Sequence, residues 1–262
     1  MLKKLKSTLL RWRQNPICRD VLISHKHRFM LFTTAKCGSG TAKEWFLYVH
    51  NGLFDQHISA GRVDEYLGMS VHDYVCNPKT RFYATEKELL HTAHSYLKII
   101  VVRNPWKRVV SFYSDKILIR KNWLPALNVL TKENYSKDIT FREFVRYIEQ
   151  IPNSALERHL RSQNYARENI GFDFVVKLEK FGVEMAQIAK ALQLPQPLVG
   201  IHIHRNRTPY DENLTAAHTF DMKPREIIYP PPYQYFYDQE LHDIVRAKYR
   251  QDIERFNYEF QD

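Results

Sequence analysis

The chain has 262 residues, of which 44% are apolar and 26% are charged, as in an ordinary globular protein. That length is enough for one α/β domain or two small ones, with a core that needs no disulfide support. The net charge of +10, from 39 Lys and Arg against 29 Asp and Glu, favours anionic partners such as nucleic acid, phosphate-rich nucleotides, acidic glycans or a membrane surface. Three cysteines without paired spacing exclude a disulfide framework and predict a reducing, cytoplasmic compartment.

Two further classes of protein lack support in the sequence. It contains no CxxC, HExxH or acidic metal-binding loop, so we expect no metal site. No apolar run approaches the roughly 20 residues that a membrane-spanning helix needs.

The amino-terminal region predicts a basic arm over residues 1–27, ahead of a single domain over residues 28–262. Apolar residues recur in the arm at helical spacing, namely Leu2, Leu5, Leu9 and Trp12. A helix over residues 1–13 could pack this stripe on the domain or lie peripherally on an anionic membrane. Residues 1–28 hold eight Lys and Arg against one acid, Asp20, so most of the net charge comes from the arm.

Apolar runs and amphipathic stretches alternate along the rest of the chain. The apolar runs predict buried strands over residues 28–34, 97–102 and 172–178. The amphipathic spacing predicts helices over residues 42–50, 105–116, 140–150, 183–192 and 241–256. Residues 195–236, rich in Pro, His and Tyr, are expected to be mostly loop. Strands that alternate with helices predict an α/β fold with a central, mainly parallel sheet flanked by helices.

A small, glycine-rich loop separates the first predicted strand from the first predicted helix. It reads Lys36-Cys37-Gly38-Ser39-Gly40-Thr41-Ala42. Such a loop between a strand and a helix can direct backbone N–H groups at an anion. Its lysine precedes the glycines, whereas a Walker A loop places lysine directly after the last glycine and before Ser or Thr. A P-loop NTPase is therefore disfavoured, while an anion-binding loop and a simple glycine turn both stay open at this point.

A second motif follows the second predicted strand. It reads Arg103-Asn104-Pro105-x-x-Arg108-x-x-Ser111. Asn104 suits the N-cap of the following helix, and Pro105 fits its first turn. Arg103 at the carboxyl end of a strand and Ser111 on the next helix can converge on one phosphate.

Together the two motifs resemble those of the carbohydrate-type sulfotransferases of family 2, which use 3′-phosphoadenosine-5′-phosphosulfate (PAPS). The family includes chondroitin and heparan 2-O enzymes and many bacterial relatives, and we expect a bacterial member. Residues 36–41 follow its first motif and residues 103–111 its second. The segment 172–181 and the closing helix resemble further family segments. Ala35 stands where the family usually has proline, which removes a backbone restraint but no reacting group.

The resemblance implies a fold related to nucleotide kinases and in-line transfer of a sulfuryl group from PAPS to a hydroxyl of a carbohydrate or glycan-containing acceptor. It places the 5′-phosphosulfate on the loop over residues 36–42, where Lys36 would stabilise the leaving phosphate oxygen. It places the 3′-phosphate on Arg103 and Ser111. The loop residues implied in cofactor binding are Lys36, Cys37, Gly38, Ser39, Gly40, Thr41 and Ala42. Arg207 and Thr208, in a basic downstream segment, are further cofactor candidates, and no metal is implied.

The acceptor hydroxyl needs a general base, for which His72 before Asp73 is the leading candidate. Other candidates between the motifs stay open, namely His57, His91, His94, Glu86 and Glu44. His159 and Arg161 lie in a segment that resembles the family's His-x-x-x-Gln pattern. They could contact an anionic sugar or belong to a solvated helix face.

Residues 98–121 form a second basic region, with seven Lys and Arg against Asp115. Within it, Lys107 and Arg108 could offset the charge of PAPS or lie at the surface in water, and the wording of the family motif favours Arg108 near the surface. Two alternatives remain for the whole chain: a nucleotide-dependent kinase of related fold, and a non-catalytic basic nucleic-acid-binding protein. The aromatic residues fall mostly at core-like spacing, which disfavours a nucleic-acid partner.

Overall fold

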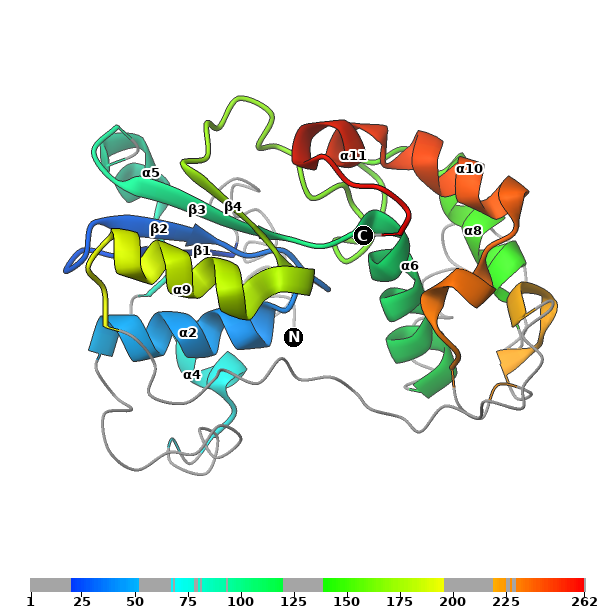
Figure 1. The fold of residues 1–262 in the computed structure, drawn as a ribbon, viewed down its shortest axis with the longest axis horizontal. Helices are drawn as coiled ribbons and strands as arrows, with labels where there is room; N and C mark the ends of the chain where they lie inside the picture. Colours follow the sequence, from blue (N-terminus) through cyan, green and yellow to red (C-terminus); the bar gives the residue numbers. More distant parts are fainter. Residues whose placement is uncertain are drawn as a thin grey trace, which may run out of the picture. The chain divides into compact units, whose positions relative to one another are not determined.

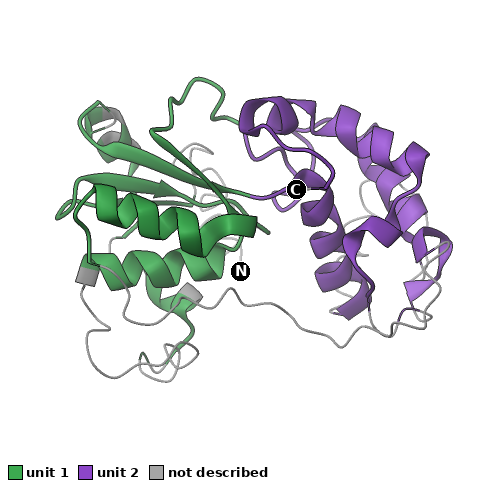
Figure 2. Ribbon diagram, viewed as in Figure 1, with its two compact units in different colours: residues 1–102, 166–204 green, residues 103–165, 205–262 purple. Residues whose placement is uncertain are grey.

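The computed structural model describes residues 20–51, 67, 69–77, 80, 82–92, 94–119, 139–195, 219–224, 227 and 230–261. The chain forms two compact units (Figure 2). Unit 1 consists of residues 1–102 and 166–204, and unit 2 of residues 103–165 and 205–262. The division into an arm and one domain stays a prediction, and the arm up to residue 19 lies outside the described residues.

Unit 1 is built on a four-stranded sheet with the strand order β1-β2-β3-β4 (Figure 1). The strands are β1 (Val21–Ser24), β2 (Phe29–Phe32), β3 (Leu97–Val102) and β4 (Phe174–Lys177). β2, β3 and β4 run parallel, whereas β1 runs antiparallel to β2. The predicted α/β class with a mainly parallel sheet is therefore confirmed, and all three predicted strands are present.

The first strand, β1, differs from the sequence prediction, which left this segment in the arm. Val21 pairs with Phe32 and Ser24 with Phe29, and all four residues of β1 are buried. Residues 25–28 form the hairpin turn between β1 and β2, and Arg28 adopts a φ of 53°. The sheet thus begins ahead of the predicted boundary at residue 28, because an apolar segment closes its edge.

Two helices of unit 1 pack on one face of the sheet. The helical segments of this unit are α2 (Ser39–Asn51), α4 (Val71–Cys76), α5 (Glu86–Thr92), the 3-10 turn η2 (Leu178–Lys180) and α9 (Phe181–Ala191). Phe46 of α2 and Met185 of α9 share one core with Leu31, Val101 and Val176, and Figure 1 shows both helices on the same side of the sheet. Since neighbouring residues of a strand face opposite ways, Phe32 and Val102 face the other side.

Unit 2 is helical in its described part. Its elements are α6 (Pro105–Tyr113), the π-helix η1 (Ser114–Ile119), α8 (Phe141–Gln150), the 3-10 turns η3 (Thr219–Asp221) and η5 (Tyr233–Phe236), α10 (Gln239–Lys248) and α11 (Arg250–Phe256). Phe112, Phe144 and Val245 belong to its core. The closing helix predicted over residues 241–256 is interrupted at Tyr249, whose hydroxyl donates to the carbonyl of Leu160 at 2.7 Å.

The start of α8 shows how the sequence determines a helix boundary. The Thr140 hydroxyl accepts the Glu143 N–H at 3.2 Å, and the Glu143 carboxylate accepts the Thr140 N–H at 2.7 Å. This capping box satisfies backbone donors that the first turn of a helix otherwise leaves without partners. The predicted apolar face is also confirmed, because Phe141, Phe144, Val145 and Ile148 are fully buried.

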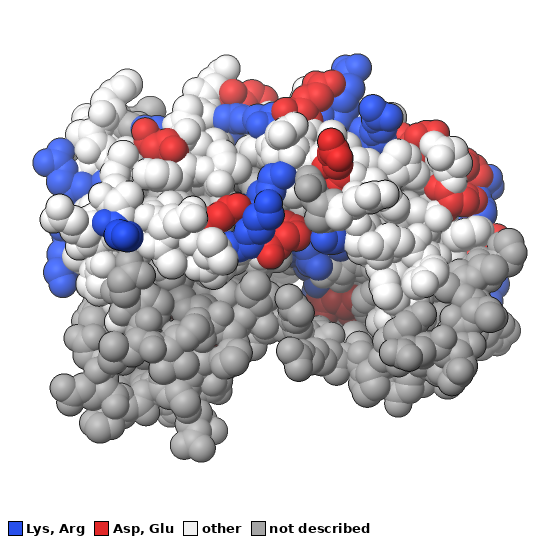
Figure 3. Space-filling model, viewed as in Figure 1, with Lys and Arg blue, Asp and Glu red and all other residues white. Residues whose placement is uncertain are grey.

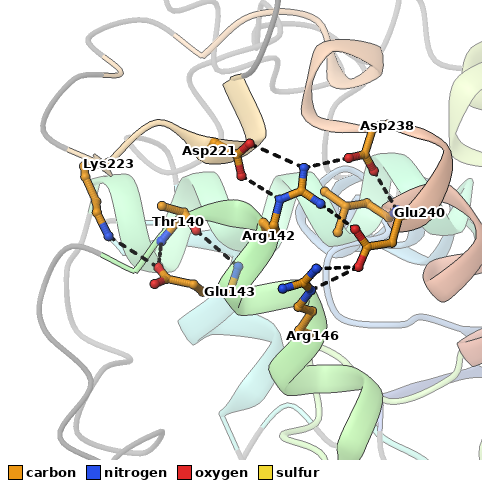
Figure 4. A network of polar contacts seen from close by, with 9 residues as sticks. Thr140, Arg142, Glu143, Arg146, Asp221, Lys223, Asp238 and Glu240 are labelled. Carbon is orange, nitrogen blue, oxygen red and sulfur yellow. Dashed lines mark hydrogen bonds and ion pairs between the residues drawn. The ribbon is translucent and has the colours of Figure 1, made fainter.

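An ion-pair network joins α8 to the start of α10 and to η3 (Figure 4). The Arg142 guanidinium donates to Asp221 and Asp238 at 2.6 Å each and to Glu240 at 2.7 Å. The bonds to Asp221 raise the pKa of Arg142, with a smaller contribution from Asp238, although burial opposes the rise. One guanidinium thus connects three segments of unit 2 that lie far apart in the sequence.

Candidate functional site

The glycine-rich loop joins β2 to α2 through two residues with left-handed backbone conformation. The Cys37 N–H donates to the Thr34 carbonyl at 3.1 Å, which closes a turn with Lys36 at its third position. Lys36 has a φ of 66° and Gly38 a φ of 68°. A lysine rarely adopts this region, whereas glycine enters it without cost. The loop then passes directly into α2, which begins at Ser39.

Gly38 is favoured by its positive φ and also lies close to a neighbouring side chain. A Cβ atom at this position would lie 2.3 Å from Leu178 Cδ1. Leu178 follows β4, in the segment that the sequence linked to the family, so the packing joins two predicted family segments. At Gly40, by contrast, a Cβ atom would meet nothing within 4 Å.

The remaining loop residues differ in what they present to solvent. Cys37, Thr41 and Ala42 are buried, whereas Ser39 is half-buried and Gly40 is exposed. The backbone N–H groups of Cys37 and Ala42 are bonded within the protein, to the carbonyls of Thr34 and Gly38. Lys36 is half-buried, so the only cation among the loop residues 36–42 is partly accessible to solvent.

Arg167 lies beside the entrance to the loop, and the sequence did not point to it. Its guanidinium donates from Nη1 to the Thr34 hydroxyl at 3.0 Å and from Nη2 to the Thr33 carbonyl at 3.2 Å. It also lies over the Phe32 ring, 5.6 Å from the centroid, and Arg167 is only 5% exposed. The end of β2 is therefore held from a distant part of the chain, immediately before Lys36.

The second motif opens unit 2. Asn104 caps α6 as predicted, because its Oδ1 accepts the N–H groups of Trp106 at 3.0 Å and Lys107 at 3.2 Å. Its Nδ2 donates to the Glu259 carbonyl at 2.8 Å. Arg103, which comes directly after β3 in the chain, is half-buried and its backbone is bonded to the Gln163 side chain.

Ser111 is half-buried on α6, whereas Arg108 is only 1% exposed. The placement of Arg108 at the surface is therefore wrong: the helix turns this position into the protein. Lys107 lies over the Tyr233 ring, 5.1 Å from its centroid.

The basic region over residues 98–121 includes two lysines that lie close to acidic residues. Lys98 lies 3.7 Å from Asp173, and Lys116 lies 3.9 Å from Asp115. On the face shown in Figure 3, basic and acidic side chains of the described residues are interspersed. Lys98 and Lys116 thus have local acidic partners, and residues 120 and 121 lie outside the described part.

His159 and Arg161 belong to a segment of turns rather than to a helix face. His159 Nδ1 lies 2.7 and 2.9 Å from the two carboxylate oxygens of Glu157, and Oε2 also accepts the backbone N–H of His159. Burial pushes the pKa of Glu157 upward, but the bonds from His159 outweigh it and the pKa falls below its usual value. Arg161 donates to the Leu156 carbonyl at 2.6 Å and lies over the Tyr165 ring.

The candidate general bases are only partly described. His72 lies on α4, whose N-cap Ser70 accepts the Asp73 N–H, but the His72 side chain is outside the described atoms. His91 and His94 are exposed and Glu44 is half-buried. The side chain of Glu86 lies outside the described part, as do His57, Arg207 and Thr208 entirely. The roles assigned to these residues stay predictions.

The described residues show neither a metal-binding cluster nor a membrane-spanning helix. No three His, Cys, Asp or Glu side chains in the described ranges gather so that they could hold a metal ion. No helix in the part of the chain that the structure describes has the length and apolar character to cross a membrane.

Comparisons with known proteins identify the family. Carbohydrate sulfotransferase 10 of Xenopus laevis is 29% identical over 142 residues, which cover 49% of this chain and 38% of the relative. The human protein of the same name is 26% identical over 139 residues, which cover 49% of this chain and 37% of the relative. The matching stretch thus spans less than two fifths of either relative, and no solved structure gives a significant match.

A family model described as "Sulfotransferase family" matches residues 19–259. This match extends across both units and includes both motifs. The predicted resemblance is therefore confirmed, and the chain belongs to the sulfotransferase family.

Proposed function

We propose that this protein transfers a sulfuryl group from PAPS to a hydroxyl of a carbohydrate-containing acceptor. The observation that supports it most is the loop after β2, where Lys36 has a φ of 66° at the entrance to α2. A non-glycine residue in this region costs free energy, and such residues cluster at functional sites. The family match and the name of the relatives favour sulfuryl transfer as the reaction that such a loop would serve.

The local electrostatics suit a phosphate-rich donor. Neither α2 nor α6 has an acidic residue in its first turn. The N-terminus of a helix carries a partial positive charge and unpaired N–H groups, which favour anions. We assign the 5′-phosphosulfate to the loop over residues 36–42 and the 3′-phosphate to Arg103 and Ser111.

The proposed reaction is an in-line displacement at sulfur. The acceptor oxygen forms a bond to sulfur while the bond between sulfur and the 5′-phosphate oxygen breaks, which gives a sulfate ester and 3′,5′-ADP. The ammonium group of Lys36 would stabilise the negative charge that develops on the leaving phosphate oxygen. The proton of the acceptor hydroxyl would pass to a general base, for which we propose His72.

The acceptor and the location are also proposals. His159 and Arg161 are half-buried, so each retains accessible surface for an anionic sugar. The name of the relatives favours a carbohydrate acceptor. We further propose a cytoplasmic enzyme that could contact a membrane through residues 1–13.

The test is a thermal-shift titration of the purified chain with 3′,5′-ADP, ATP and an oligonucleotide, because a ligand that binds only the folded state raises its melting temperature. Stabilisation by 3′,5′-ADP but not by the other two supports the proposal. A shift with ATP or the oligonucleotide and none with 3′,5′-ADP would favour a kinase or a nucleic-acid-binding protein instead. Transfer of labelled sulfate from PAPS to a panel of glycans then identifies the acceptor.

A further inference from the structure

The side-chain amide of Gln163 forms two hydrogen bonds to the backbone of Arg103. Its Oε1 accepts the Arg103 N–H at 2.7 Å, and its Nε2 donates to the Arg103 carbonyl at 2.9 Å. Both backbone groups of one residue are thus bonded by one side chain, much as a neighbouring strand would bond them. Gln163 is only 1% exposed, so water does not compete for these bonds.

Gln163 is itself held by Asp252 of α11. Asp252 Oδ2 accepts the Gln163 N–H at 2.8 Å and lies 3.4 Å from the Gln163 amide nitrogen. Asp252 Oδ1 accepts the Ser162 hydroxyl at 2.5 Å and the Asn164 N–H at 2.9 Å. The carboxylate is completely buried, a placement that is stable only when its oxygens are bonded in this way.

Hydrogen bonds thus connect Asp252 of α11, through Gln163, to Arg103, the residue after β3. Asp252 fixes the backbone of residues 162–164, and that backbone presents the Gln163 amide to Arg103. The rotamers that a side chain can adopt depend on the φ and ψ of its residue. The two hydrogen bonds from Gln163 therefore limit the positions that the Arg103 guanidinium can reach.

We infer that Gln163 and Asp252 are positioning residues for recognition of the 3′-phosphate, acting through the backbone of Arg103. This inference rests on the proposed function, which assigns that phosphate to Arg103. Neither residue needs to touch the nucleotide. Their contribution is that Arg103 is preorganised, so that binding does not have to order it.

A matched pair of ligands separates this role from a merely structural one. Adenosine 5′-phosphate lacks the 3′-phosphate but is otherwise identical to 3′,5′-ADP. Loss of a positioning contact lowers affinity for 3′,5′-ADP alone, whereas general loosening of the fold lowers both affinities.

The experiment measures both dissociation constants by calorimetry for the wild type and three variants. Gln163→Met keeps an unbranched side chain of similar length but removes both bonds to Arg103. Gln187→Leu, at an exposed position of α9, is the control for replacing a glutamine with an apolar residue. Arg103→Met removes the guanidinium itself.

We expect Q163M to reduce the preference for 3′,5′-ADP over adenosine 5′-phosphate about tenfold, the range of one charge-assisted hydrogen bond. The control Q187L should keep the wild-type preference. In the double variant with R103M, the Gln163 substitution should reduce the preference no further, because both changes act on the same interaction.

An unchanged preference in Q163M, an equal loss of both ligands, or additive losses in the double variant would each overturn the inference. If Q163M does not fold, Ser162→Ala weakens the hold of Asp252 while leaving Gln163 in place, and a smaller loss of preference is expected. A wild type that binds neither ligand, or both equally, would instead overturn the assignment of the 3′-phosphate, and with it this inference.

Discussion

Arg167 donates a hydrogen bond from Nη1 to the Thr34 hydroxyl at 3.0 Å, across a separation of 133 residues. Thr34 begins the turn that places Lys36, so the bond joins a distant arginine to the entrance of the proposed phosphosulfate loop. A buried guanidinium with two bonds to this turn should hold it in place before any ligand arrives.

Substitution of Arg167 tests this role. Arg167→Met should lower the free energy of unfolding by about 2 to 3 kcal/mol, since hydrogen bonds to a charged group are lost. Thr34→Val removes only the hydroxyl and should cost about 1 kcal/mol. Urea denaturation measures both changes, and an R167M protein as stable as the wild type would contradict the role.

Two substitutions of Lys36 separate backbone strain from the loss of the ammonium group. Lys36→Gly relieves the left-handed backbone and should be about 1 kcal/mol more stable than Lys36→Ala, which removes the same charge without that relief. Both variants should lose sulfuryl transfer, because the ammonium group is gone. Thermal melts and transfer assays on the pair measure the two effects separately, and equal stability would argue against strain at Lys36.

Two glycines of the same loop should respond differently to alanine. Gly38→Ala combines a positive φ with a close approach to Leu178, so it should destabilise the protein by about 1 kcal/mol or more. Gly40→Ala lies at the start of α2 with open space around it and should leave the melting temperature unchanged or slightly higher. Equal melting temperatures for the two variants would mean that the loop relaxes freely.

His72→Ala should reduce turnover by about 10²-fold or more, the usual contribution of a general base, while 3′,5′-ADP binding stays intact. His94→Ala and His91→Ala test the other histidine candidates in the same assay. His25→Ala, at an exposed position whose ring bonds Tyr96, is the control and should keep its activity. Near-normal turnover in H72A would remove His72 from the site.

The Arg142 network should make stability depend on pH. Burial pushes the pKa of Asp238 upward, but the Leu241 N–H and Arg142 outweigh it, so the folded-state pKa lies below the unfolded one. The resulting stabilisation is present above the unfolded pKa, near 4, and is lost as the pH falls through the folded one.

Arg142→Met should therefore destabilise the protein by about 1 kcal/mol at pH 7, after allowance for solvent screening. The difference from the wild type should shrink in acid. Arg146→Met is the control, because Arg146 is 53% exposed and bonds only Glu240 among the pairs drawn in Figure 4. If urea titrations show that R142M loses the same free energy of unfolding at every pH, the network does not cause the pH dependence.

Elements with strong local signals could be predicted from the sequence. Asn104 and Pro105 mark the start of α6, and the structure confirms both the cap and the helix. The apolar run over residues 97–102 coincides with β3. β1 was missed because four residues give too short a pattern and because the turn over residues 25–28 contains no Gly, Asn or Asp to mark a hairpin.

The residues that support the site could not be predicted in the same way. Gln163, Asp252 and Arg167 act on partners that lie 60, 89 and 133 residues away in the sequence. Such contacts leave no local periodicity and appear only when the chain is folded. Arg108 was misplaced for the same reason, since a basic residue in a charged stretch gives no sign that the helix buries it.

The contacts of the second motif with the C-terminal segment bear on how the protein matures during synthesis. The backbone of Arg103 depends on Asp252 through Gln163, and Asn104 bonds the carbonyl of Glu259. A nascent chain on the ribosome can assemble the sheet and the glycine loop early. The Gln163 that bonds Arg103 lacks its support from Asp252 until residue 252 has left the exit tunnel, and Asn104 Nδ2 lacks its bond to Glu259 until residue 259 has followed. Full affinity for the nucleotide would thus be delayed until residues 252 and 259 have been synthesised.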